Sequence, residues 1–72
     1  MRIELDTVIE AGEKSWEVAS HWATRYGVKA EVVTEHGPAG GNPIIAYEGD
    51  EDKLRELVLA EYGRDALETA FA

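Results

Sequence analysis

The pattern of apolar and polar residues predicts three β-strands, two by alternation and one by a continuous apolar run. Residues 2–10 place Ile3, Leu5, Thr7 and Ile9 on one face and mostly charged residues on the other, which is the two-residue period of a half-buried strand. Residues 28–35 repeat the pattern, with Val28, Ala30, Val32 and Thr34 facing inward. Residues 44–48 instead begin with four consecutive apolar residues. Such a run is typical of a central strand.

Two segments carry apolar residues at the spacing of a helix. In residues 12–26 the apolar side chains fall in one arc of the helix, and the segment ends before Gly27. The segment after Asp50 has an apolar stripe of the same kind and ends at Gly63. Asp50 is placed to accept hydrogen bonds from the free N–H groups of that second helix. The pair Asp65 and Glu68 predicts a capping box for a last short helix. The apolar residues of these three helices are Trp16, Ala19, Trp22, Ala23 and Tyr26; then Leu54, Leu57, Val58 and Tyr62; then Leu67, Ala70 and Phe71.

The order of these elements predicts a single α+β domain over residues 1–72, with a three-stranded sheet and both long helices on one face. If residues 44–48 form the central strand, the strand order is 1-3-2. That order is the split βαβ arrangement, a ferredoxin-like fold truncated before its final strand. The sequential order 1-2-3 is the alternative that the pattern leaves open.

The composition restricts the kinds of function that are physically open to the chain. Its 72 residues carry a formal net charge of −8 and no cysteine. A negative field disfavours direct contact with nucleic acid or an anionic membrane, because both attract positive surfaces. The absence of cysteine, and the acids near the first residue where a secretion signal would be apolar, predict a cytoplasmic protein.

The residue patterns indicate neither an enzyme nor a metal or cofactor site. His21 and His36 are not at the spacing of metal ligands, and no nucleophile has a base arranged beside it. The acidic run of residues 49–52 lacks the alternating oxygen ligands of a calcium loop, so a helix cap explains it more simply. The glycine-rich residues 37–43 join two strands without a following lysine. A rigid hairpin connection therefore fits them better than a phosphate cradle.

The predicted fold leaves one face of the sheet without a covering helix. That face carries Glu4, Asp6, Val8 and Glu10, then Lys29, Glu31, Val33 and Glu35, then Ile44 and Ala46. We expect Val8, Val33 and Ile44 to form a small apolar centre within a rim of carboxylates such as Glu31, a pattern typical of a protein-binding patch. An ordinary solvated sheet surface is the alternative reading.

A second predicted contact lies on the first helix, at the border of its apolar arc. Trp22 lies there beside Val18, and a tryptophan at the rim of a small core is a favoured interface anchor. We therefore add Trp22 and Val18 to the candidate partner-binding residues. A homodimer through the open sheet face is one form that such binding takes.

The C-terminal half resembles small accessory proteins encoded by phages of actinobacteria. The resemblance rests on the glycine-rich residues 37–43, the short strand ending at Glu48-Gly49, and the acidic cap and leucine-rich helix that end at Tyr62-Gly63. Those proteins are mostly of unknown function, and some act by binding a host protein. The resemblance implies a host-encoded protein partner in the host cytosol, and it carries no functional residue over to this chain.

The sequence thus favours a small acidic protein-binding module, in the form of a phage-encoded modulator of a host protein. The alternative is an acidic mimic of nucleic acid that blocks a DNA- or RNA-binding protein. A mimic needs carboxylates spaced like phosphates, and Arg2 and Lys29 interrupt the most suitable face.

Overall fold

The computed structural model describes residues 1–37 and 40–71, which form three strands and three helices around one core. Their order is β1 (Arg2–Asp6), α1 (Ser15–Tyr26), β2 (Lys29–Thr34), β3 (Ile44–Glu48), α2 (Glu51–Glu61) and α3 (Arg64–Ala70). The predicted α+β class and element order are confirmed. Pro38 and Ala39 of the predicted hairpin loop, and Ala72 of the tail, lie outside the described residues.

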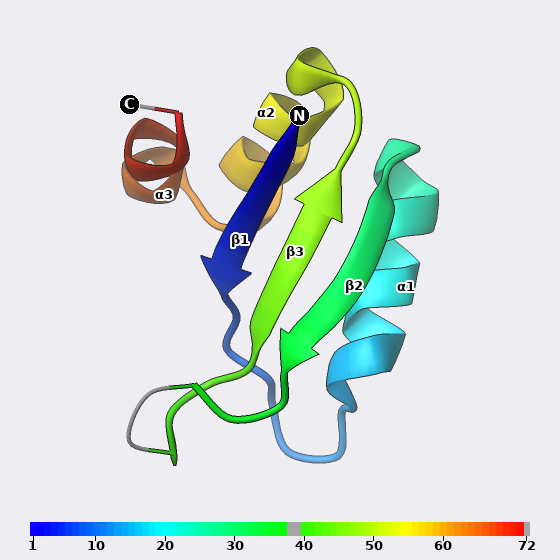
Figure 1. Ribbon diagram of the computed structural model, residues 1–72, viewed down its shortest axis with the longest axis vertical. Helices are drawn as coiled ribbons and strands as arrows, with labels where there is room; N and C mark the ends of the chain where they lie inside the picture. The colour runs from blue at the N-terminus through cyan, green and yellow to red at the C-terminus, as the bar shows by residue number, and fades with distance from the viewer. Residues whose placement is uncertain (38–39, 72) are drawn as a thin grey trace.

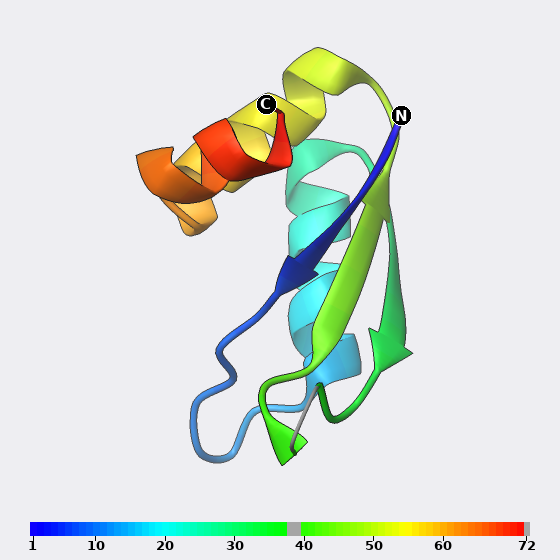
Figure 2. The ribbon, with the colours of Figure 1, turned by 60° about the vertical axis from the view of Figure 1, so that its left-hand side comes forward.

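The strand order is β1-β3-β2, so the prediction of a central β3 is confirmed. β3 runs antiparallel to both neighbours, and the two outer strands are therefore parallel to each other, as in a split βαβ unit. The helices lie on one side of the sheet, with α1 behind β2 and with α3 beyond the outer edge of β1 (Figures 1 and 2).

The core lies between the sheet and the helices. Alternation along the strands turns Ile3 and Leu5 of β1 and Ile45 and Tyr47 of β3 toward the helices, where all four are buried. The stripe of α2 meets them through Leu54, Leu57 and Val58, each of which is fully buried. Burying each such side chain contributes about 1.5–3 kcal/mol, so these contacts hold α2 on the sheet.

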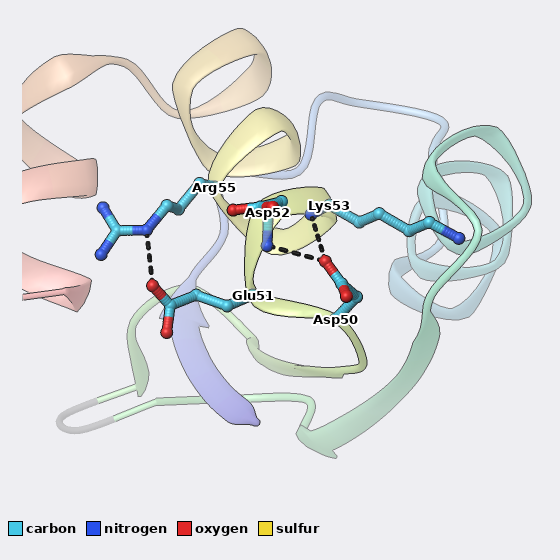
Figure 3. Close-up of polar contacts among 5 residues, drawn as sticks. All are labelled: Asp50, Glu51, Asp52, Lys53 and Arg55. Atoms are coloured by element: carbon cyan, nitrogen blue, oxygen red, sulfur yellow. Dashed lines mark hydrogen bonds and ion pairs between the residues drawn. The ribbon is translucent and has the colours of Figure 1, made fainter.

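The predicted ends of the long helices follow their local chemistry. α1 stops at Gly27, whose φ of 69° is a left-handed conformation that glycine adopts readily. Asp50 caps α2, and its Oδ1 accepts hydrogen bonds from the amides of Asp52 at 2.9 Å and Lys53 at 3.4 Å (Figure 3). The acidic run therefore begins a helix, as predicted.

The first strand is shorter than predicted, and α1 begins later. The amide of Thr7 still donates to the carbonyl of Pro43 at 2.9 Å, but proline has no N–H with which to continue the ladder. Val8 and Glu10 consequently lie in the loop after β1 rather than in the sheet. Gly12 lies in a turn with a φ of 90°, which a helix cannot contain, so α1 starts at Ser15.

A β-bulge interrupts β2 near its end. Val32 pairs with Ile45, but Thr34 rather than Val33 is opposite Ile44. The extra residue changes which face the following side chains point to. Glu35 accordingly does not join the open face as predicted, and its Oε2 accepts a 2.6 Å hydrogen bond from the Ser15 hydroxyl at the start of α1.

The last helix packs on the helical side of the sheet. Its half-buried residues Ala66, Leu67 and Ala70 contact the core, as does Phe71. α3 begins at Arg64 with Gly63 as its N-cap and without a side-chain cap, so the predicted Asp65–Glu68 capping box is wrong. The reason is that the helix starts earlier, which places Asp65 inside the first turn.

Candidate functional site: the open sheet face and its edges

The side of the sheet away from the helices is uncovered among the described residues, and we call it the open face. The register of the strands arranges its side chains in three rows across β1, β3 and β2. The first row is Arg2, Glu48 and Lys29, the second is Glu4, Ala46 and Glu31, and the third is Asp6, Ile44 and the bulge residues Val33 and Thr34. Four carboxylates thus share this face with two cations.

Arg2 connects the two outer strands of the open face. Its guanidinium lies 3.7 Å from a carboxylate oxygen of Glu4 and 3.8 Å from one of Glu31. To reach Glu31 it crosses the central strand, where Ala46 is only 2% exposed although it belongs to the open face. Both ion pairs are exposed to water, so each contributes under about 1 kcal/mol to stability. Because Arg2 lies close to both Glu4 and Glu31, the carboxylates of the open face do not form the uninterrupted series of negative charges that a nucleic-acid mimic needs.

The structure brings together two of the three predicted apolar residues. Val33 is 43% exposed at the bulge, next to the half-buried Ile44 of the same row. Val8 is 73% exposed, but it lies beyond the end of β1 in the following loop. Glu31 is exposed on the open face, one row away. The apolar part of the open face is therefore a strip at the end of β2 and β3 rather than a ringed centre.

Trp22 is half-buried at the rim of the core, where the sequence placed it. Its ring packs edge-on against Tyr62, with the centroids 5.3 Å apart, and it contacts the core. With Val18 and His21 it also lines a shallow depression on α1. Trp16 is the exposed tryptophan, at 59%. The apolar arc of α1 contains both Trp16 and Trp22, but it did not predict which of the two would be the more exposed.

A further hollow lies at the loop end of the molecule, and the sequence patterns did not predict it. It has a volume of about 540 Å³ and lies between the loop after β1 and the loop before β3. Trp16 and Lys14 line it from the start of α1, and His36 and Asn42 line it from the second loop. The exposed Trp16 gives it an aromatic wall, and the Ser15–Glu35 hydrogen bond closes one side.

Three hydroxyl groups form a largely buried chain just after β1. The Thr7 hydroxyl donates to the carbonyl of Leu5 at 3.1 Å and lies 2.7 Å from the Tyr62 hydroxyl, which lies 3.0 Å from that of Tyr47. Because Thr7 has one proton to donate, Tyr62 donates to it and accepts from Tyr47. Burial raises the pKa of both tyrosines. Both therefore stay protonated at physiological pH, and their hydroxyls link the residue after β1 to the end of α2 and to β3.

The hydrogen bonds of β1 show which of its backbone groups are free. Met1 exchanges hydrogen bonds with Gly49, and Thr7 donates to Pro43, so the odd-numbered residues of β1 point toward β3 in the antiparallel pattern. The N–H and C=O groups of Arg2, Glu4 and Asp6 therefore point outward. Among the described residues, β3 is the one strand that pairs with β1, and outside the sheet ladder none hydrogen-bonds to the backbone of Glu4 or Asp6. β1 is an open and regular edge.

Comparison with known proteins leaves the site to be interpreted from its own chemistry. No protein-family model, no curated protein and no solved structure matches the chain. The described residues contain no group of three or more histidine or acidic side chains placed to hold a metal ion. None of the helices in this part of the chain is long and apolar enough to cross a membrane.

Proposed function

We propose that this chain is a protein-binding module and that the open face is its docking surface. The observation that carries the proposal is that the helices lie on one side of the sheet (Figure 2), whereas Val33 is exposed and Ile44 half-buried on the other side. An exposed apolar strip beside charged residues is the usual composition of a protein interface. The predicted residue Glu31 belongs to this surface, whereas Trp22 and Val18 belong to a separate depression on α1.

The charge of the open face defines the chemistry of the partner. Its carboxylates outnumber its cations, and the whole chain has a net charge of −8. A partner with a basic surface around an apolar patch gains both attraction at long range and burial at contact. A second copy of the chain brings the same negative charge, which opposes a homodimer through this face. By its resemblance to phage accessory proteins, the partner is a host protein.

Affinity capture with two matched variants tests the proposal. Val33→Asp places a charge in the apolar strip, and Leu59→Asp places the same charge on α2, where Leu59 is 48% exposed on the helical side. Both substitutions remove a surface aliphatic residue of similar exposure. The immobilised wild type and variants are incubated with an actinobacterial extract, and retained proteins are quantified by mass spectrometry.

We expect a basic protein that the wild type and Leu59→Asp retain equally and that Val33→Asp retains about tenfold less, as for the loss of an interface centre. Retention should persist at raised salt, because the apolar contact is not screened. If no protein is retained, or if Val33→Asp retains the same proteins as the control, the open face is not a docking surface.

A further inference from the structure

A groove runs along the free edge of β1, between that strand and α3. It has a volume of about 430 Å³. Its buried and half-buried members are Leu5, Tyr62, Ala66 and Ala70, and its exposed members include the acids Glu4, Asp6 and Asp65. The two alanines give α3 a flat surface toward β1. The groove therefore combines an apolar floor, an acidic rim and unpaired backbone groups.

An extended segment placed beside β1 fits all three of these features. Its backbone would pair with the outward N–H and C=O groups of Arg2, Glu4 and Asp6, about 4.8 Å from β1. Its side chains would alternate between the two sides of the sheet. One set would lie over α3, which projects beyond the outer edge of β1 (Figure 1), and the other would lie beside Glu4 and Asp6.

We infer that the edge of β1 binds an extended segment of another protein by strand addition, and that aliphatic residues alternate with lysine or arginine in that segment. The aliphatic side chains enter the groove over Leu5, Ala66 and Ala70. The basic side chains pair with Glu4 and Asp6 on the open face, and Asp65 adds a third negative charge at the rim. Backbone pairing gives affinity in this mode of recognition, while alternate side chains give specificity.

Charge favours this occupant over a second copy of the chain. Two β1 strands pairing with each other would place Glu4 and Asp6 close to the same acids of the other copy, and like charges across a strand pair are destabilising. The other edge of the sheet is also less suited, because the bulge at Val33 interrupts its regular pairing. The acidic groove beside β1 is therefore the better template for a basic strand.

The inference deepens the proposed function by naming a partner segment, and it depends on that function only in requiring a protein ligand. Val33 lies on β2, on the opposite edge of the sheet from the groove. The Val33→Asp variant should accordingly bind a peptide at β1 as the wild type does. If the peptide fails to bind while Val33-dependent capture succeeds, the strand-addition inference falls and the proposed function stands.

A peptide titration tests the inference directly. The probe is a seven-residue peptide of alternating lysine and valine, and its binding to the ¹⁵N-labelled protein is followed by amide chemical shifts and hydrogen exchange. We expect the largest shifts at residues 2–6 and 65–70. With the peptide at saturation, exchange of the Glu4 and Asp6 amides should slow at least about tenfold, because they become hydrogen-bonded. Unchanged exchange at both amides would overturn the inference.

Control peptides and variants separate strand addition from simple charge attraction. A peptide with glutamate in place of lysine, and one with two central amides N-methylated, should each bind at least about tenfold more weakly. Asp6→Lys and Asp65→Lys should weaken binding by a similar factor, and the matched Glu17→Lys variant on α1 should not. Equal binding by the methylated peptide, an equal loss in Glu17→Lys, or a dimer of the free chain in light scattering would each contradict the inference.

Discussion

The two outer strands of the sheet are both edges, but they are held at their ends by different interactions. Thr7, the residue that follows β1, is buried and is linked through its hydroxyl to Tyr62 and Tyr47. β2 ends in a bulge, and the residue that follows it, Glu35, is hydrogen-bonded to Ser15 at the loop end of the molecule. The strand that is fixed from inside the core keeps a regular ladder, and the strand that is fixed by a partly exposed contact does not.

This difference has an energetic basis. In the hydroxyl chain Thr7 and Tyr47 are buried and Tyr62 is half-buried, so the bonds are strengthened by the low polarity around them, and losing one member leaves the others unsatisfied. The Ser15–Glu35 bond has one buried and one exposed partner, so water replaces part of what is lost if it breaks. Changes at the β1 end should therefore cost more than changes at the β2 end.

The largest effect is expected from Tyr62→Ala. This change removes the ring that packs against Trp22 and Tyr47 and the hydroxyl that holds Thr7. We expect a loss of about 3–5 kcal/mol in the free energy of unfolding, which equals about the whole stability of a domain this small. Urea denaturation followed by circular dichroism measures it. Trp16→Ala, at an exposed aromatic residue, should change the stability by less than about 0.5 kcal/mol. Equal effects of the two variants would show that Tyr62 does not anchor β1.

A graded loss of stability is expected at alkaline pH. Burial raises the pKa of Tyr47 and Tyr62 in the folded protein, whereas both ionise near pH 10 when the chain unfolds. The stability that they provide is thus complete below pH 10. Above it the free energy of unfolding should fall, by at most about 1.4 kcal/mol per pH unit for each tyrosine, until the pH reaches that tyrosine's pKa in the folded protein. Urea denaturation at increasing pH measures this slope, and Tyr47→Phe should reduce it. A slope that does not change in that variant would contradict the assignment.

The smallest effect is expected from Ser15→Ala at the β2 end. The change removes the 2.6 Å hydrogen bond to Glu35 and leaves an exposed carboxylate that water can solvate. We expect a loss of about 1 kcal/mol, together with amide shifts in residues 33–36. Ser20→Ala, an exposed position in the same helix, is the matched control and should be close to neutral. A loss in Ser15→Ala no larger than in the control would mean that this contact does not hold the end of β2.

The sequence predicted most of the fold because its local signals agree with the tertiary arrangement. The apolar run of Ile44 to Tyr47 indicated a central strand, and Gly27 and Asp50 marked helix ends through backbone chemistry that acts within a few residues. The alternation in β1 correctly separated the buried Ile3 and Leu5 from the exposed Glu4. These features depend on neighbours in the sequence.

The errors occur where a distant residue determines the outcome. β1 stops early because its partner at Thr7 is Pro43, and Glu35 leaves the open face because of a bulge opposite Ile44. Neither pairing is visible before the register is known. Trp22 contacts Tyr62, forty residues later in the chain, while Trp16 is exposed, and the helix pattern alone did not predict this difference between them. The groove beside β1 depends on where α3 packs, which has no local signal in the sequence.

The alanine at position 46 limits how the open face can vary among related sequences. It lies beneath the guanidinium that joins Glu4 to Glu31, with almost no surface left to water. A larger residue there would lift Arg2 away and leave two carboxylates facing each other across the central strand without a cation between them. Substitutions at positions 46 and 2 should consequently arise together. In a library randomised at both positions and selected for folded protein, the residue found at position 46 should depend on the residue found at position 2.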